Sequence, residues 1–151
     1  MYKLSVFVIA KYFLSQASMT HKKLQKLCYY GQAWHCALEG SPLFMERIEA
    51  WVHGPVIPDL YQKYKGYGWQ KIPSVSMDES ELPESALEVL KAVYDTYGEF
   101  SGDQLEALTH TEAPYQEARK GLNPYDTCTN EITPHSMSEY YLKQYQDAQN
   151  D

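Results

Sequence analysis

The sequence predicts a mainly α-helical, compact single-domain fold of about six helices, with a small sheet of two or three strands. Apolar residues recur at helical spacing in several segments, and glycine or proline residues separate these segments from one another. The composition, with 44% hydrophobic and 22% charged residues, is typical of a folded domain. We therefore treat residues 1–151 as one domain, with its motifs at about 5–141 and a polar tail of the last helix at 142–151.

The first two helices are predicted from their apolar faces and their ends. Ser5 is expected to cap the first helix, whose apolar residues are Val6, Ile9, Ala10, Phe13 and Leu14. Thr20 begins the second helix and Gly40 follows its end. The apolar face of this second helix comprises Leu24, Leu27, Cys28, Gly31, His35 and Leu38. Glycine costs about 1 kcal/mol relative to alanine inside a helix, so we expect another element to pack closely against Gly31.

The next segment is predicted to form a strand, a turn and a helix. The apolar run Ile48–Val52 indicates the strand, and His53, Gly54 and Pro55 follow it directly. Gly54 is expected to relieve the backbone of the turn, and Pro55 to end the strand. Pro58 suits the first position of a helix because its missing N–H needs no partner there. The apolar residues of this helix are Leu60, Tyr61 and Tyr64.

The rest of the chain predicts further helices and two short strand segments. Helices are expected at 86–97, 114–120 and 134–146, and another begins at the capping box formed by Ser101 and Gln104. Residues 122–133 are expected to form a long loop. Ile72 and Ile132 are expected to join Ile48–Val52 in the sheet. The core-facing residues of the last helix are predicted to be Met137, Tyr140, Tyr141 and Tyr145.

Charge and cysteine content argue against several classes of protein. The formal net charge is −7, and the short basic cluster at 21–26 does not reverse it, so we expect no direct nucleic-acid binding. Three cysteines without disulfide spacing fit a reducing cytoplasm. The apolar N-terminal stretch is too short to span a bilayer. We therefore expect a soluble cytoplasmic protein that does not bind membranes.

The sequence contains no recognisable catalytic or metal-binding motif. The phosphate-binding loop, the serine nucleophile elbow and the zinc-protease helix motif do not occur. Cys28 and Cys36 are expected to be small buried residues, because free cysteine is among the most buried residue types. The five histidines are too scattered to predict a metal site. We expect no catalytic residue, no bound metal and no cofactor.

The segment THTEAPYQEAR at 109–119 leaves two interpretations open. His110, Glu112, Glu117 and Arg119 could form a charged group for acid–base catalysis, since histidine titrates near neutral pH. In the second interpretation, which we favour, His110 hydrogen-bonds a neighbouring loop and Arg119 pairs with a carboxylate at the helix end.

Four segments taken together resemble one family. They are SVFVIAKYFL, MTHKKLQKLCYYGQAWHCALEGSPLFMERIEAWVHGPVIPDLYQKYKGYG, YGEFSGDQLEALTHTEAPYQEARKG and ITPHSMSEYY. In this order, over about 5–141, they are similar to the Panacea antitoxin domain of SocA-like and phage-associated GepA-like proteins. Tyr115 departs from the family pattern, which usually has tryptophan at this position.

The resemblance implies a non-enzymatic antitoxin, often carried by a prophage, that binds and neutralises a protein toxin encoded nearby. One alternative, also known in the family, is a proteolytic adaptor that delivers the toxin to the ClpXP protease. Another alternative is an enzyme that reverses the action of the toxin, centred on His53 and His110. The sequence does not identify the toxin, the stoichiometry or the oligomeric state.

The candidate toxin-binding residues come from a physical argument, because the family match does not identify an interface. Stable interfaces bury roughly 800 Å² per partner, and aromatic residues often supply most of the binding energy. Aromatic and histidine residues near irregular backbone are therefore our candidates: Trp51, His53, Tyr61, Tyr64, His110 and Tyr115. A packing role within the domain is the alternative for each. Gly54, Pro55 and Pro58 are predicted to be structural residues of the turn.

Overall fold

The computed structural model describes residues 4–150 and confirms the predicted fold class. Over this range it has seven α-helices: α1 Val6–Gln16, α2 His21–Glu39, α3 Pro58–Tyr64, α4 Glu84–Tyr97, α5 Gly102–His110, α6 Ala113–Ala118 and α7 Pro134–Gln149. Two strands, β1 Glu49–Trp51 and β2 Gly54–Val56, form an antiparallel hairpin. Two short 3₁₀ helices are also present, η1 Lys65–Tyr67 and η2 Glu79–Glu81.

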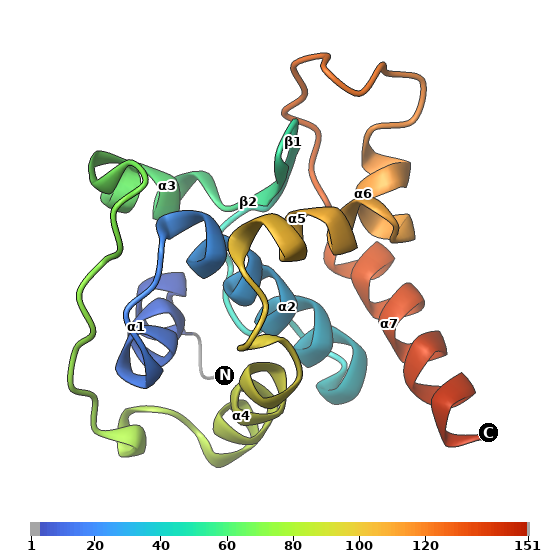
Figure 1. The fold of residues 1–151 in the computed structure, drawn as a ribbon. Coiled ribbons are helices and arrows are strands. Elements are labelled where there is room, and N and C mark those ends of the chain that lie inside the picture. Colours follow the sequence, from blue (N-terminus) through green and yellow to red (C-terminus); the bar gives the residue numbers. More distant parts are fainter. Residues whose placement is uncertain (1–3, 151) are drawn as a thin grey trace.

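The helix α2 lies at the centre of the molecule, with the other elements arranged around it (Figure 1). It is buried on nearly all sides, as is typical of a helix enclosed by others. The predicted single apolar face is therefore too narrow, because Tyr29 and Tyr30 are fully buried as well. Leu38 was expected on that face but is exposed near the end of the helix.

Most of the predicted helix ends are confirmed. The Thr20 side chain accepts a hydrogen bond from the Lys23 amide at 3.3 Å, and Gly40 ends α2 with φ of 75°. The capping box of Ser101 and Gln104 is present at α5. The prediction for Ser5 is wrong, because its side chain makes no capping hydrogen bond. The Glu46 carboxylate instead accepts a hydrogen bond from the first amide of α1, at 3.0 Å.

The close contact predicted at Gly31 is also confirmed. A Cβ atom at this position would lie 3.0 Å from the Leu90 side chain of α4 and near two side chains of α1. Glycine therefore allows α2 to pack tightly against both neighbouring helices.

The hairpin corrects the prediction for Pro55. Trp51 pairs with Gly54 and Ala50 with Pro55, so Val52 and His53 form the turn and Pro55 belongs to the second strand. Pro55 therefore does not end the sheet, and the helix α3 follows only after β2. The expectation for Gly54 is confirmed by its φ of 111°, which L-residues rarely adopt. Pro58 is the first residue of α3, as predicted.

The other predicted strands contribute little to the sheet. Ile72 pairs with Met19 and not with β1, through two backbone hydrogen bonds of 2.8 and 3.3 Å. Its assignment to the sheet was therefore wrong. Glu131 forms an isolated bridge with Glu49, and the Ile132 amide donates to the Ile48 carbonyl at 2.9 Å. This segment thus extends the hairpin by a single bridge.

The fully buried residues of the helix α7 lie in its first half. Met137 and Tyr141 are buried and Tyr140 is half-buried, whereas Tyr145 is exposed. The prediction that Tyr145 faces the core is therefore wrong, because the C-terminal half of α7 extends away from the other helices (Figure 1).

Candidate functional site

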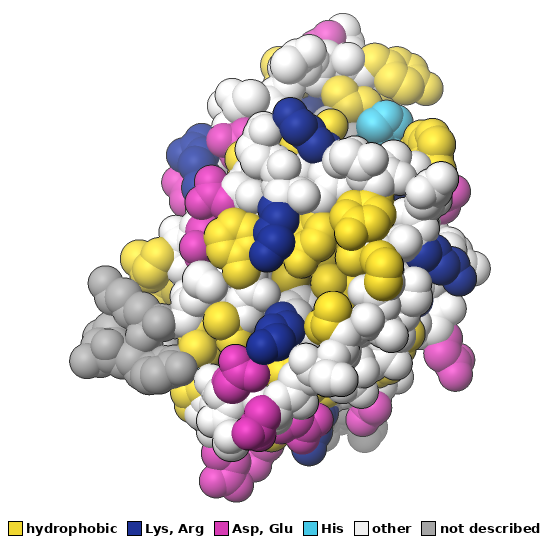
Figure 2. Space-filling view, turned by 90° about the vertical axis from the view of Figure 1, so that its left-hand side faces the viewer, with side chains coloured by type: hydrophobic (Ala, Val, Ile, Leu, Met, Phe, Trp, Pro, Cys, Tyr) yellow, Lys and Arg dark blue, Asp and Glu magenta, His cyan; other side chains and the backbone are white. Residues whose placement is uncertain are grey.

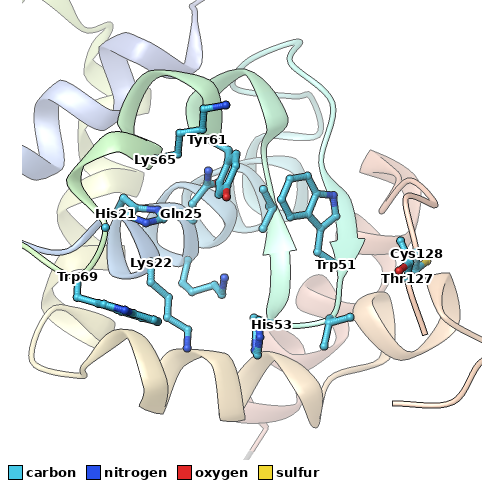
Figure 3. Close-up of a pocket in the computed structure, with 14 residues that line it drawn as sticks. His21, Lys22, Gln25, Trp51, His53, Tyr61, Lys65, Trp69, Thr127 and Cys128 are labelled. Atoms are coloured by element: carbon cyan, nitrogen blue, oxygen red, sulfur yellow. The ribbon is translucent and has the colours of Figure 1, made fainter. Parts of the chain in front are cut away.

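A groove of about 520 Å³ lies beside the hairpin (Figure 3). It is formed by the start of α2, the hairpin, α3 with the segment after it, and the loop at 122–133. Its lining residues are His21, Lys22, Gln25, Lys26, Trp51, Val52, His53, Val56, Tyr61, Lys65, Gly68, Trp69, Thr127 and Cys128. Three of the predicted candidates, Trp51, His53 and Tyr61, thus line one groove.

Aromatic rings form much of the groove surface. The ring of Tyr61 lies edge-on to Trp51 with centroids 5.0 Å apart, and edge-on to His21 at 5.8 Å. The Trp51 indole donates a hydrogen bond to Glu49 at 2.9 Å, which fixes the ring orientation. Trp69 is 84% exposed and lies at the opposite side of the groove in Figure 3. The groove therefore combines ordered rings with a large exposed indole.

Lys26 lies under the hairpin and is only 1% exposed. Its ammonium group donates a hydrogen bond to the Pro55 carbonyl at 3.2 Å. A Cβ atom on Gly54 would lie 2.7 Å from Lys26 Cε, so glycine is needed here for space as well as for its φ. Burial lowers the pKa of Lys26 to about 7.

Gln25 joins the same helix to the segment that follows the hairpin. Its side-chain amide accepts a hydrogen bond from the Ile57 amide at 2.8 Å and donates to the Ile57 carbonyl at 3.2 Å. Because both backbone groups of one residue are bound, α2 fixes where α3 begins.

His53 lies at the tip of the hairpin, with 74% of its side chain exposed. Its Nδ1 lies 3.3 Å from Glu106 Oε2 on α5. Lys22 forms ion pairs with Glu106 and with Asp103, the latter at 2.7 Å. Figure 3 shows Lys22 and His53 both pointing toward α5. This cluster therefore bounds one end of the groove.

Tyr115 and His110 lie behind the hairpin and not in the groove. The Tyr115 hydroxyl donates to the carbonyl oxygens of Trp51 and Val52, at 2.5 and 3.1 Å, and only 5% of the residue is exposed. The His110 ring stacks on Tyr115 with centroids 4.5 Å apart. Tyr115 thus holds the turn residues in place from inside the domain.

Tyr64 is also separate from the groove lining. It is half-buried, packs against the hydrophobic core and lies 6.3 Å from the ring of Tyr67. The structure therefore brings three candidates to the groove and places Tyr64, His110 and Tyr115 elsewhere.

The charged segment at 109–119 does not form the arrangement expected from the sequence. Glu112 Oε1 accepts hydrogen bonds from the hydroxyls of Tyr30 and Tyr141, both at 2.8 Å, and burial raises the pKa of Glu112. Arg119 binds backbone carbonyls instead of a carboxylate, so that prediction is wrong.

The expected hydrogen bond from His110 to a loop is not observed either. Its Nε2 is buried without a hydrogen-bond partner among residues 4–150, and burial lowers the pKa of His110. Stacking on Tyr115, not hydrogen bonding, therefore holds this ring.

The cysteines do not provide an activated thiol. All three are buried, as expected for Cys28 and Cys36, and burial raises the pKa of Cys28 and brings that of Cys36 to about 11. Within the described residues, no group of three or more His, Cys, Asp or Glu side chains could hold a metal ion. None of the described helices is long and apolar enough to cross a membrane.

Sequence reasoning missed several residues of the groove. Lys26, Gln25 and Trp69 were not candidates, although Lys26 and Trp69 contribute a buried charge and the most exposed indole. One sequence signal could have identified Gln25 and Lys26 as residues that face other elements. They come directly before the apolar residues Leu27 and Cys28 in the second helix.

The family model of the antitoxin SocA-like Panacea domain matches residues 24–116. No curated protein and no solved structure matches the chain. The matched range covers most of α2, the hairpin, α3, α4 and α5, and therefore most of the groove lining. It spans well over half of the sequence, so the chain belongs to the SocA-like antitoxin family that carries a Panacea domain.

Proposed function

We propose that this protein is an antitoxin that neutralises a protein toxin by binding it directly, without enzymatic activity. Family membership over residues 24–116 is the observation that carries the proposal. We extend the Panacea-type domain to the whole of residues 1–151, because α1 and α7 pack against the matched α2. The toxin is expected to be encoded nearby and to meet the antitoxin in the cytoplasm.

The groove is the surface that best suits such binding. Interfaces are held mainly by aromatic and arginine side chains that insert into well-packed surroundings. Trp51 and Tyr61 offer ordered rings inside the groove, while Trp69 and His53 stand exposed at its border. We propose these four residues as the toxin-binding set.

The remaining candidates are better suited to a supporting role. Tyr115 and His110 contact the hairpin or each other inside the domain, and Tyr64 packs against the core. We propose that they hold the groove in shape without contacting the toxin. Gly54, Pro55 and Pro58 set the path of the backbone around it.

The proposal is tested by expressing the protein together with the product of the neighbouring reading frame. Growth should be restored, and the two proteins should co-purify at a fixed molar ratio. Restored growth without any complex would overturn direct binding. Detoxification by substoichiometric protein would instead indicate an enzyme. Rescue that disappears in a host lacking ClpXP would indicate a proteolytic adaptor.

A further inference from the structure

The charged residues that line the groove are all basic or histidine. The lining contains Lys22, Lys26, Lys65, His21 and His53, and no aspartate or glutamate. The chain as a whole has 20 acidic residues against 13 lysines and arginines, so this distribution opposes the overall charge. On the face with α1 and α3, Figure 2 shows lysine and arginine side chains among hydrophobic ones, with acidic side chains around them. The basic lining of the groove itself favours a partner of opposite charge.

Neither Lys26 nor Lys65 forms an ion pair with a carboxylate among the described residues, although Glu106 is near enough to Lys26 to raise its pKa. The hydrogen bond that Lys26 makes is to a backbone carbonyl, and ion pairs at this end of the groove involve Lys22 instead. Lys65 is exposed and makes no ion pair within residues 4–150. Burying an ammonium group without an opposite charge is costly, so an incoming carboxylate would offset that cost.

The carboxylates next to the groove argue against a highly charged polyanion, such as a nucleic acid, as its ligand. Asp103 and Glu106 lie beside Lys22 and leave that lysine with no excess positive charge. A nucleic-acid backbone would be repelled by these carboxylates, whereas one or two carboxylates could approach Lys65 without contacting them. The aromatic rings then suit apolar side chains next to the carboxylates.

We propose that the groove binds an acidic segment of the partner protein, with its carboxylates directed at Lys65 and Lys26 and apolar side chains packed against Trp51, Tyr61 and Trp69. This inference rests on the proposed function and specifies the chemistry of the toxin surface. The volume of about 520 Å³ is within the range of pockets that enclose small ligands, so a short segment and not a whole face would enter it.

The test compares Lys65→Glu with Lys143→Glu in binding to the purified co-encoded toxin. Both changes reverse one exposed charge, but Lys143 lies on α7 and forms an exposed ion pair with Asp147. We expect Lys65→Glu to weaken binding at least about 10-fold at low salt and by about 3-fold or less at 0.5 M salt, since salt screens exposed charges. Lys143→Glu should change the affinity less than about 2-fold.

A charge-swap experiment identifies the partner segment. Aspartate or glutamate residues of the toxin are changed one at a time to lysine, and one such change should restore binding to Lys65→Glu. Unchanged or tighter toxin binding by Lys65→Glu would overturn the proposal that an acidic segment enters the groove. Displacement of the toxin by a single-stranded oligonucleotide would overturn it as well.

The two proposals fail in different ways. If wild-type protein does not bind the toxin at all, direct neutralisation is wrong. If wild-type protein binds and neutralises the toxin but Lys65→Glu does so equally well, only the acidic segment is wrong. Circular dichroism of both variants checks that each is folded.

Discussion

Gly54 and Lys26 together decide how the hairpin lies on α2. The Lys26 side chain passes under Gly54, and a Cβ atom there would lie 2.7 Å from Lys26 Cε. Gly54 also has a φ of 111°, which is unfavourable for other residues. The groove therefore depends on a glycine that satisfies two separate requirements.

The first residue-scale prediction concerns Gly54→Ala. It should lower the free energy of unfolding by about 3 kcal/mol, because backbone strain and overpacking add. Gly40→Ala is the matched control, since Gly40 has a φ of 75° in the left-handed region with nothing within 4 Å of a Cβ, and it should cost about 1 kcal/mol. Urea denaturation measures both. Equal losses would show that contact with Lys26 contributes nothing.

The second residue-scale prediction concerns the pH dependence of stability. The pKa of Lys26 is about 7 in the folded protein, below its ordinary value of 10.5, so the unfolded chain binds more protons between these values. The contribution of Lys26 to stability is fully present above its pKa of 10.5 in the unfolded chain. It is lost as the pH falls through the pKa of about 7 in the folded protein. Its contribution should rise by about 2 kcal/mol from pH 7 to pH 9.

Lys26→Met isolates this contribution. The variant should lack the rise, and the difference between the two urea-unfolding profiles should follow the titration of one group. The other charged groups near Lys26, namely Glu106, Lys22, His21 and His110, remain in both proteins. A parallel pair of profiles between pH 7 and pH 9 would contradict a lowered pKa at Lys26.

The turn position of Gly54 is easier to predict from the sequence than the burial of Lys26. A glycine next to a proline indicates a turn directly, because its backbone freedom has a physical cause that does not depend on the rest of the fold. A lysine on a helix is normally placed at the surface. Only the packing of the hairpin over α2 buries Lys26, and that packing is tertiary.

At the scale of elements, Arg119 ties α6 to the hairpin and to the long loop. Its guanidinium donates to the Ala50 carbonyl of β1 at 2.9 Å and to the Asp126 carbonyl at 2.7 Å. The Asn123 and Pro124 carbonyls accept from it as well, at 3.2 and 3.3 Å. One buried side chain thus positions the loop that contributes Thr127 and Cys128 to the groove.

Arg119→Met should therefore loosen this loop. We expect a loss of about 2 kcal/mol in unfolding free energy, since several carbonyls lose a charged donor. Hydrogen exchange should become faster at 122–130. Lys120→Met is the control, because Lys120 is exposed and adjacent in sequence. Unchanged exchange in Arg119→Met would contradict the role of Arg119.

Helices were predicted better than strands for a physical reason. Caps and apolar periodicity are local, so Thr20, Gly40 and the Ser101–Gln104 box could be identified from neighbouring residues alone. The hairpin pairs β1 with a strand containing Pro55, which pattern rules assign to a turn. The pairing of Ile72 with Met19 joins segments distant in sequence, and no local pattern indicates it.

At the scale of the whole molecule, the domain surrounds α2 so that one end of this helix contributes to the groove. The first turns of α2 supply His21, Lys22, Gln25 and Lys26, while α4 and α7 pack against the helix elsewhere. Three toxin-binding candidates named from the sequence, Trp51, His53 and Tyr61, lie in this groove, and their role in binding stays a prediction. The sequence did not predict that Trp69 joins them, because Trp69 lies in an irregular segment whose path depends on the Ile72–Met19 pairing.

The affinity of the purified toxin for Trp69→Ala, relative to the wild-type protein, tests the groove as the toxin-binding surface most directly. Trp69 is 84% exposed, so its removal should leave the fold unchanged. Tyr145→Ala, on the exposed end of α7, is the control. We predict that Trp69→Ala weakens binding by about 10-fold or more, as expected for an aromatic anchor, and that Tyr145→Ala binds like wild type. Wild-type affinity in Trp69→Ala, with a loss in Tyr145→Ala, would contradict the assignment of the groove.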